Sequence, residues 1–357
     1  MLKDGRPLFM ESTGDDSFGG ETAEMRERRI RMHIDNIRGV NKNIFPLVQG
    51  YLRGEVKELD IRILHAASEE ILVVHDILEE SEMSDYFKHD LDADSRHACS
   101  NLMSITGEED DKDFDRQTMQ FFVKGWRRFY VAVEDMLLRK IYETKISKED
   151  VSELNLEVMK DVIDYFGENE KSHMDKFAYE MPAYSNIEQK KFTNEIDFNA
   201  LQAQLHDKEI KANTAVVMNL LLNEIRNSLK DKTEIDGVTT GVALSAHVEG
   251  KQLVLQVIDD GKGISAIDLD PESPSFIFRK GTTKTDSTGL GLANAQERIA
   301  TMGAELRVIS YRNDEDKTNF YPPESKFDLD EFNKNRVKEG KMKARTIFEI
   351  RLPIEDK

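Results

Sequence analysis

The sequence predicts an α plus α/β protein in which an N-terminal helical bundle precedes an α/β sandwich domain. Between residues 21 and 180, apolar side chains recur at steps of three and four, the period of an amphipathic helix. After about residue 185, short strand-like runs alternate with helical patterns. The length of 357 residues allows two or three domains.

The N-terminal part is expected to begin with a tail. Residues 1–20 are rich in Gly, Ser and acidic residues, without apolar periodicity, which is typical of a disordered segment. Residues 21–90 are predicted as a helical input region of unknown ligand, with helices at about 22–52 and 56–83.

Residues 91–146 are predicted as a helical hairpin. The acidic stretch 107–113 reads as its turn, and the helix after it carries one wide apolar stripe that requires partner helices. Residues 147–189 are expected to be a helical connector. The stripe consists of Met119, Phe122, Val123, Trp126, Phe129, Tyr130, Val133, Leu137 and Ile141.

Residues 190–357 are predicted as the α/β domain. A polar stretch, 311–344, lies between two strands expected to be neighbours, and is therefore predicted as a surface insertion with a short helix near 328–338. The expected strands are 241–248, 253–259, 304–310 and 345–353, and the expected helices about 211–230 and 289–302.

Charge and composition exclude several classes of function. The chain has 50 Lys and Arg against 69 Asp and Glu, a net charge of −19. Such a field repels nucleic acid and anionic membranes, so we expect neither as a partner. No run approaches the ~20 apolar residues of a membrane-spanning helix, and no secretory pattern opens the chain. The single cysteine, Cys99, agrees with a reducing compartment, and we expect a cytoplasmic location.

The helix predicted at 211–230 carries a row of carboxamides. Asn219, Asn223 and Asn227 lie at steps of four and share one face, while an apolar stripe lies on the opposite side. Amide oxygens are neutral ligands for Mg²⁺, although a plain polar face would show the same pattern.

Two further segments fit a bound nucleotide. Asp259 ends a strand and precedes Gly261 and Gly263, so a carboxylate that could accept a hydrogen bond from adenine stands beside backbone that can approach the ring. A common Asp-Gly turn is the alternative. The loop before the helix at 289–302 is rich in Gly, Thr and Lys, and reads as a lid whose free amides and cations meet phosphates. Its expected contacts are Arg279, Lys280, Thr282, Thr283, Lys284, Gly289, Leu290, Gly291 and Leu292.

These motifs resemble, in order and spacing, the N, G1, F and G2 boxes of the histidine kinase ATP-binding domain. The boxes correspond to Asn219/Asn223, Asp259-Asp260-Gly261-Lys262-Gly263, Phe276/Phe278 and Gly289-Leu290-Gly291-Leu292, and the resemblance covers about 190–353.

The resemblance implies a site for ATP and Mg²⁺. By it, Asn223 would ligate the metal, Asp259 would read adenine, and Gly289 and Gly291 would let the lid close. One departure is Glu224, which stands where the family usually has a small residue. The other is the 311–344 insertion.

The same resemblance separates kinases from ATPases. Relatives that hydrolyse ATP typically have a glutamate, the base that activates water, four residues before the metal-binding asparagine. Here that residue is Asn219, which cannot take a proton. An amide there favours a kinase over a gyrase, chaperone or repair ATPase.

A phosphoacceptor is expected on the hairpin. His97, Asn101 and Ser104 share one helix face beside an apolar stripe, a pattern similar to the phosphoacceptor box of histidine kinases. Ala98 departs from it, because many such kinases have an acid directly after the histidine. His75, followed by Asp76, is the second candidate, and His65 the third. By resemblance, Asn101 would position water to remove phosphate from a regulator; a capping or solvent-facing role is the alternative.

The resemblance therefore implies an autophosphorylating histidine kinase that dimerises through the hairpin and passes its phosphoryl group to the aspartate of a response-regulator receiver domain. Two alternatives stay open: a protein serine kinase of the same superfamily, and a non-catalytic scaffold that binds ATP. The acid lability of incorporated phosphate separates the three.

Overall fold

The computed structural model divides into two compact units, Met1–Glu143 and Thr144–Lys357. Each is described by itself. The structure describes residues 2–3, 6–7, 22–52, 54–55, 146–164, 166–167, 191–230, 241–279, 292, 295–312 and 314–357, and helical positions 127, 130, 131, 133–135, 137, 138 and 141.

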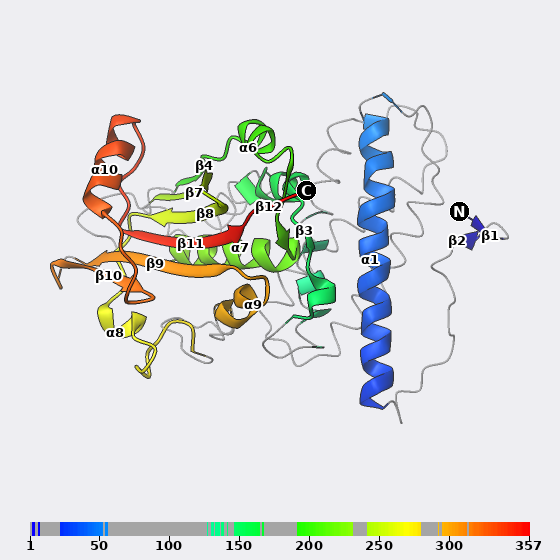
Figure 1. Cartoon of the computed structure of the whole chain (residues 1–357), viewed down its shortest axis with the longest axis horizontal. Coiled ribbons are helices and arrows are strands. Elements are labelled where there is room, and N and C mark those ends of the chain that lie inside the picture. Colours follow the sequence, from blue (N-terminus) through cyan, green and yellow to red (C-terminus); the bar gives the residue numbers. More distant parts are fainter. Residues whose placement is uncertain are drawn as a thin grey trace, which may run out of the picture. The chain divides into compact units, whose positions relative to one another are not determined.

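In the first unit, the long helix α1, Ala23–Leu52, matches the helix predicted at 22–52 (Figure 1). One side of it is apolar and buried, as its periodicity predicts. A short two-stranded sheet of β1 (Leu2–Lys3) and β2 (Arg6–Pro7) lies in the same unit. The buried apolar side of α1 consists of Ile30, Ile34, Ile37 and Val40.

The described helical positions between 127 and 141 are buried on more than one side. Tyr130, Val133 and Leu137 belong to the predicted apolar stripe and are buried. Charged Glu134 is buried as well, and Arg38 of α1 donates to its Oε1 from Nη2 at 2.6 Å. These helical positions therefore lie in the interior of their unit. The buried Glu134 carboxylate needs the Arg38 guanidinium, because an unpaired buried charge is costly.

The second unit is built on a six-stranded sheet (Figure 1). All neighbouring strands are antiparallel except β4, which runs parallel to β7. The four strands predicted from the sequence form its centre, and β9 and β11 are neighbours, as expected. In spatial order the strands are β10 (Lys317–Tyr321), β9 (Glu305–Arg312), β11 (Thr346–Pro353), β8 (Gln252–Asp259), β7 (Gly241–Glu249) and β4 (Lys191–Asn194).

One face of this sheet carries the helices that hold the candidate site. Helix α7, Thr214–Lys230, contacts β7 and β8, and helix α9, Ala295–Thr301, contacts β9 and α7. Their predicted ranges, 211–230 and 289–302, contain these helices, although residues 211–212 form strand β6. The short helix α8, Ala266–Leu269, contacts the edge strand β10.

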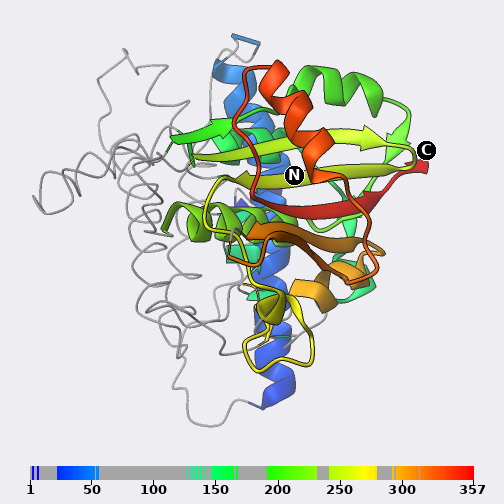
Figure 2. The same cartoon turned by 90° about the vertical axis from the view of Figure 1, so that its left-hand side faces the viewer.

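The opposite face is covered by α10, Leu329–Lys338, which lies across the strands in Figure 2. Leu329 packs on a cross-strand row of apolar residues, and Phe332 packs beside it. The alternation of side chains puts this row on the face away from Asp259. The row consists of Ala243, Ile258, Ile347 and Ile309.

The insertion predicted at 311–344 contains α10, as expected, but it is only partly a surface element. Its strand β10 completes the edge of the sheet, and Tyr321 at the end of β10 is buried. The prediction was wrong on this point because β10 is polar in composition and has side chains in contact on both faces, so it lacks the alternation that marks a half-exposed strand.

The second unit begins upstream of residue 190, where the α/β domain was predicted to start. Its first part comprises a 3₁₀ turn (Lys148–Asp150), β3 (Ser152–Glu153) and helical residues 156–164 and 166–167. Strand β3 pairs with β6 (Lys211–Ala212). The remaining elements are α6 (Phe198–Gln204) and the pair β5 (Lys208–Glu209) and β12 (Glu355–Asp356).

Some predictions lie outside the described residues. These are the tail within 8–20, the helix at 56–83, the hairpin turn at 107–113 and the later part of the connector. None of the helices in the described part of the chain combines the length and the apolar character that crossing a bilayer requires.

Candidate functional site

The three carboxamides of α7 differ in exposure along the helix. Asn219 is only 4% exposed and is held by interactions in the interior. Asn223 is half-buried, and Asn227 is exposed. The open end of the row is therefore Asn223 and Asn227, and a bound ion would lie there rather than at Asn219.

Asn223 has the chemistry that a metal ligand needs. Its amide nitrogen is buried and has no hydrogen-bond partner among the described residues. The two ends of a carboxamide are distinguished only by their hydrogen bonds, so nothing fixed opposes the orientation that presents oxygen to a cation. An uncommitted buried amide next to an exposed one fits an oxygen-preferring ion such as Mg²⁺.

Asp259, at the end of β8, connects the strand to α7 and to the turn that follows. Its Oδ2 accepts a hydrogen bond from Ser228 Oγ on α7 at 3.3 Å, and its Oδ1 accepts one from the Gly261 N–H at 2.9 Å. The half-buried carboxylate is thereby fixed at the edge of the α7 face. A carboxylate held in this way can accept a hydrogen bond from an exocyclic amine.

The two glycines of the turn differ in how closely the rest of the protein surrounds them. Gly263 has a φ of +80°, and an added Cβ would lie 2.1 Å from the Tyr311 carbonyl oxygen. At Gly261 an added Cβ would lie 2.9 Å from Asp259 Oδ1. The approach of this backbone to a base stays a prediction, whereas the structure shows that Gly263 lets the turn close against β9.

Glu224 faces the same region, which answers where this unusual residue points. It is 7% exposed, and its Oε2 has no hydrogen-bond partner among the described residues. Burial is the main cause that raises the pKa of Glu224 to about 7, and the nearby charge of Asp259 is the second. A hydrogen bond from Asn227 acts in the opposite direction and lowers this pKa. The α7 face beside Asp259 therefore contains a second carboxyl group.

The segment that leads into the predicted lid is anchored by aromatic packing. Phe276 and Phe278 are buried with their ring centroids 5.4 Å apart. The next residue, Arg279, is exposed and donates to the Pro271 carbonyl at 3.2 Å. Leu292 is half-buried. The other expected lid contacts lie outside the described residues: Lys280, Thr282, Thr283, Lys284, Gly289, Leu290 and Gly291.

The structure thus places Asp259 and Gly261, at the end of β8, beside Ser228 and Glu224 of α7, the helix that also carries Asn223 and Asn227. The expected acceptor His97, its neighbour Asn101, and the alternatives His75 and His65 all lie outside the described residues.

Sequence reasoning missed the contact of Ser228 with Asp259 and left the direction of Glu224 open. Glu224 and Ser228 are four residues apart on α7 and therefore share a helix face. That spacing was the available signal, but it does not reveal which part of the sheet the face meets.

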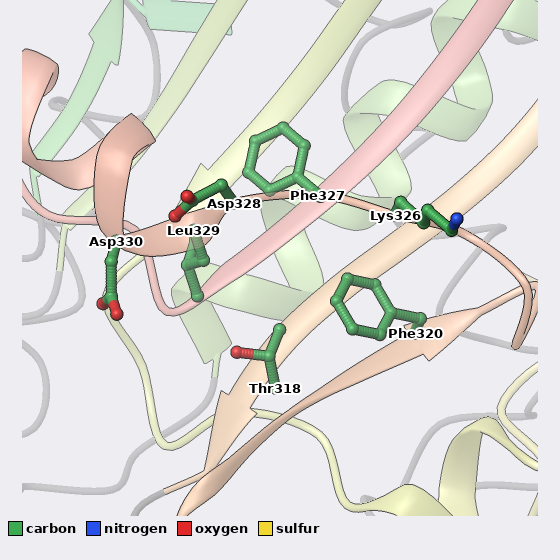
Figure 3. A pocket seen from close by; sticks show the side chains of 7 residues that line it. All are labelled: Thr318, Phe320, Lys326, Phe327, Asp328, Leu329 and Asp330. Atoms are coloured by element: carbon green, nitrogen blue, oxygen red, sulfur yellow. The ribbon is translucent and has the colours of Figure 1, made fainter.

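An open groove of about 470 Å³ lies elsewhere, on the insertion (Figure 3). The Phe320 and Phe327 rings stand over it, with the acidic side chains Asp328 and Asp330 at one end and Lys326 at the other. Leu329, which also lines it, packs on the sheet face away from Asp259. The groove is therefore separate from the carboxamide row.

Comparison with known proteins identifies the domain. Residues 211–356, less than half of the chain, match the family described as "Histidine kinase-, DNA gyrase B-, and HSP90-like ATPase". The second unit thus carries a histidine-kinase-like ATPase domain, a family that implies ATP binding. No curated protein matches the chain. The solved structure of a mycobacterial sensor histidine kinase, MprB, is similar over 52% of this chain and 97% of its own, with 14% identity and a TM-score of 0.29, too low to support a functional conclusion.

Proposed function

We propose that this chain is an ATP-dependent histidine kinase that phosphorylates its own His97 and then passes the phosphoryl group to an aspartate of a response-regulator receiver domain. The match of residues 211–356 supports the ATP-binding part of the proposal. The composition of the α7 face supports the kinase part.

Asp259 would accept a hydrogen bond from the exocyclic amine of adenine, while the backbone at Gly261 and Gly263 would border the ring. Asn223 would ligate Mg²⁺, with the more exposed Asn227 beside it. When bound, the ion would offset the charge of the phosphates. Residues 280–291 would form the lid, with Lys280 and Lys284 supplying positive charge.

The observation that carries the proposal is the absence of a carboxylate where water would be activated. If Asn223 binds the metal, the residue four positions earlier is Asn219, and if Asn227 binds it, that residue is Asn223. An asparagine cannot act as a base in either case. Glu224 is the one acid among the described residues of α7, and it is buried beside Asp259 at the adenine end. The site therefore holds nucleotide without activating water, as a kinase requires.

In the proposed reaction, an imidazole nitrogen of His97 attacks the γ-phosphorus. The bond between phosphorus and the β,γ-bridging oxygen breaks, a nitrogen–phosphorus bond forms, ADP leaves, and the imidazole loses a proton to solvent or to another base. Because Ala98 provides no adjacent acid, this proton is not taken by the next residue. We also propose that the hairpin at 91–146 forms a cytoplasmic homodimer.

The test uses γ-labelled ATP and Mg²⁺ with wild type, His97→Gln and His75→Gln. We expect label on wild type and His75→Gln, none on His97→Gln, and loss of the label in acid but not in base. If His97→Gln labels as well as wild type, the acceptor is elsewhere. Acid-stable label would instead indicate a serine kinase, and no label a non-catalytic ATP-binding scaffold.

A second test concerns the metal. Asn223→Ala should weaken Mg·ATP binding by at least about ten-fold, the effect seen even for groups that only support a metal ligand. Asn219→Ala is the matched control, because it removes the same carboxamide from a buried position. It should lower stability by about 1–2 kcal/mol and leave the magnesium dependence unchanged. Calorimetric titrations with and without Mg²⁺ measure both effects, and an unchanged Asn223→Ala titration would contradict the assignment.

A further inference from the structure

Asn213, the residue before helix α7, joins three parts of the second unit through its polar groups. Its Oδ1 accepts from the Val216 N–H at 3.0 Å, which caps the first turn of α7. Its Nδ2 donates to the Asp150 carbonyl at 2.8 Å, and its backbone N–H donates to the sulfur of Met302, directly after α9, at 3.1 Å. Because Asn213 is only 2% exposed, these bonds are shielded from competing water.

Two further hydrogen bonds attach the segment 148–155 to the start of α7. The Asn155 N–H donates to Thr214 Oγ1, in the first turn of the helix, at 3.0 Å. The Leu154 N–H donates to the Ile210 carbonyl at 2.8 Å, where β3 of this segment pairs with β6. The segment and the end of α9 therefore both hold the N-terminal end of α7.

Along the rest of its length, α7 is held mainly by apolar packing. Apolar contact is non-directional, and packed helices can slide by small distances against their neighbours. A hydrogen bond requires a defined distance and angle, so the bonds at the N-terminal end fix α7 along its own axis more sharply than its packing does. The buried apolar side chains of α7 are Ala215, Val216, Val217, Met218, Leu220, Leu221, Leu222 and Ile225.

The carboxamides of the candidate site lie further along the same helix. Asn223 and Asn227 follow Asn213 by about three and about four helical turns. Near its other end, α7 meets the strand end, where Ser228 Oγ donates to Asp259 Oδ2 at 3.3 Å. A movement of α7 along its axis would therefore change the place of both carboxamides relative to the carboxylate.

We propose that Asn213 is a positioning residue for the nucleotide site, because it ties α7 to the segment 148–155 and so sets where Asn223 and Asn227 lie relative to Asp259. This inference rests on the proposed function, which assigns Mg·nucleotide to these three residues. A binding group has to be held within about 0.5 Å of its productive position. Bound nucleotide and the docked segment therefore stabilise each other, and by the same factor in both directions.

The test compares Asn213→Asp with a matched change on the opposite face of the sheet, Asn333→Asp in α10. The Asn333 side chain donates to the Ala344 carbonyl at 2.9 Å and accepts from the Ala344 N–H at 2.7 Å. Both changes keep an accepting oxygen and remove an amide that donates to a carbonyl. In calorimetric titrations of the full chain, Asn213→Asp should weaken Mg·ADP binding about five-fold, and Asn333→Asp less than about two-fold.

A second variant shows whether the new charge is responsible. Asn213→Ser is neutral and still caps the helix, but it lacks the amide that donates to Asp150. It should weaken Mg·ADP binding as Asn213→Asp does. Equal weakening in Asn213→Asp and Asn333→Asp, or wild-type affinity in Asn213→Ser, would overturn the inference.

Amide hydrogen exchange separates this inference from the proposed function. Without nucleotide, the Gly261 N–H, in the turn near the other end of α7, should exchange faster in Asn213→Asp and not in Asn333→Asp. Bound Mg·ADP should slow exchange of the Leu154 and Asn155 N–H groups in wild type and not in Asn213→Asp. If either effect is missing, Asn213 does not position the site, whereas wild type without affinity for Mg·ADP overturns the proposed function alone.

Discussion

Glu224 lies in an environment that departs strongly from that of an ordinary carboxyl group. Its folded-state pKa of about 7 lies above the ordinary 4.5, through burial and then through Asp259. The folded state therefore binds a proton more tightly than the unfolded state does. Stability from this group is fully present below about pH 4.5 and is lost as the pH rises to about 7.

We predict that Glu224→Gln removes this pH dependence. Without Mg²⁺ and nucleotide, the variant should match wild type near pH 4.5 and exceed its stability at pH 8 by up to about 3 kcal/mol, because a shift of one unit corresponds to about 1.4 kcal/mol. Urea unfolding between pH 4.5 and 8 measures the difference. A variant whose stability falls with pH as steeply as that of wild type would show that another group is responsible.

Gly263 and Gly250 allow a matched comparison of two glycines with positive φ. Gly250 has a φ of +60° with open space around its Cβ position, whereas Gly263 has a φ of +80° and faces the Tyr311 carbonyl. Gly250→Ala should cost about 1 kcal/mol from backbone strain alone. Gly263→Ala should cost at least about 2 kcal/mol more, because the turn must also move away from β9. Equal losses in thermal unfolding would contradict the role of the carbonyl.

At the scale of elements, local patterns predicted the central strands and helices. Strands β7 and β8 are continuous apolar or alternating runs, and α7 shows its period over 17 residues. The two-residue strands β3, β5, β6 and β12 exist only because partners distant in sequence meet, which no local pattern contains.

The residues of the candidate site likewise divide into those that local patterns indicate and those that only tertiary packing brings in. The spacing along one helix was enough to put Asn223 and Asn227 on the same helix face, and the strand pattern was enough to put Asp259 at the end of β8. That Ser228 and Glu224 meet Asp259 depends on how α7 is rotated against β8, which tertiary packing decides. The burial of Tyr321 was missed for the same reason, because this residue lies in a polar stretch and is buried by aromatic neighbours from another segment.

Helix α10 is attached to the rest of its unit by a buried ion pair. Arg336 Nη2 donates to Glu195 Oε1 at 2.8 Å, and both side chains are less than one tenth exposed. Removing one partner leaves the other charge buried and unpaired.

We therefore expect Arg336→Ala to cost about 3–5 kcal/mol of unfolding free energy, and Glu195→Gln to recover part of that loss in the double variant. Lys341, 3.7 Å from the same carboxylate but more exposed, is the control. Lys341→Ala should cost less than about 1 kcal/mol. Chemical denaturation of the four variants measures the series, and a similar loss in both single cation variants would count against the special role of the buried pair.

At the scale of the whole molecule, the second unit is closed by the segment that precedes the predicted ATP-binding domain. Leu154 N–H donates to the Ile210 carbonyl at 2.8 Å, and Asn213 Nδ2 donates to the Asp150 carbonyl at the same distance. The C-terminal residue Lys357 pairs with Glu153 at 2.8 Å. This segment therefore completes the domain rather than only leading to it.

The last prediction compares two fragments, 144–357 and 190–357. The longer one keeps the apolar side chains of 146–166 that are buried in this unit, including Val158, Met159 and Ile163, and the contact of Phe166 with Phe192 at 5.4 Å. It should unfold cooperatively and bind Mg·ATP like the full chain, and it should label a separate chain carrying His97 but not itself. The shorter one exposes the surface that these side chains cover, and should lose cooperative unfolding. Equal unfolding curves for the two fragments would place the start of the folded domain at residue 190 instead.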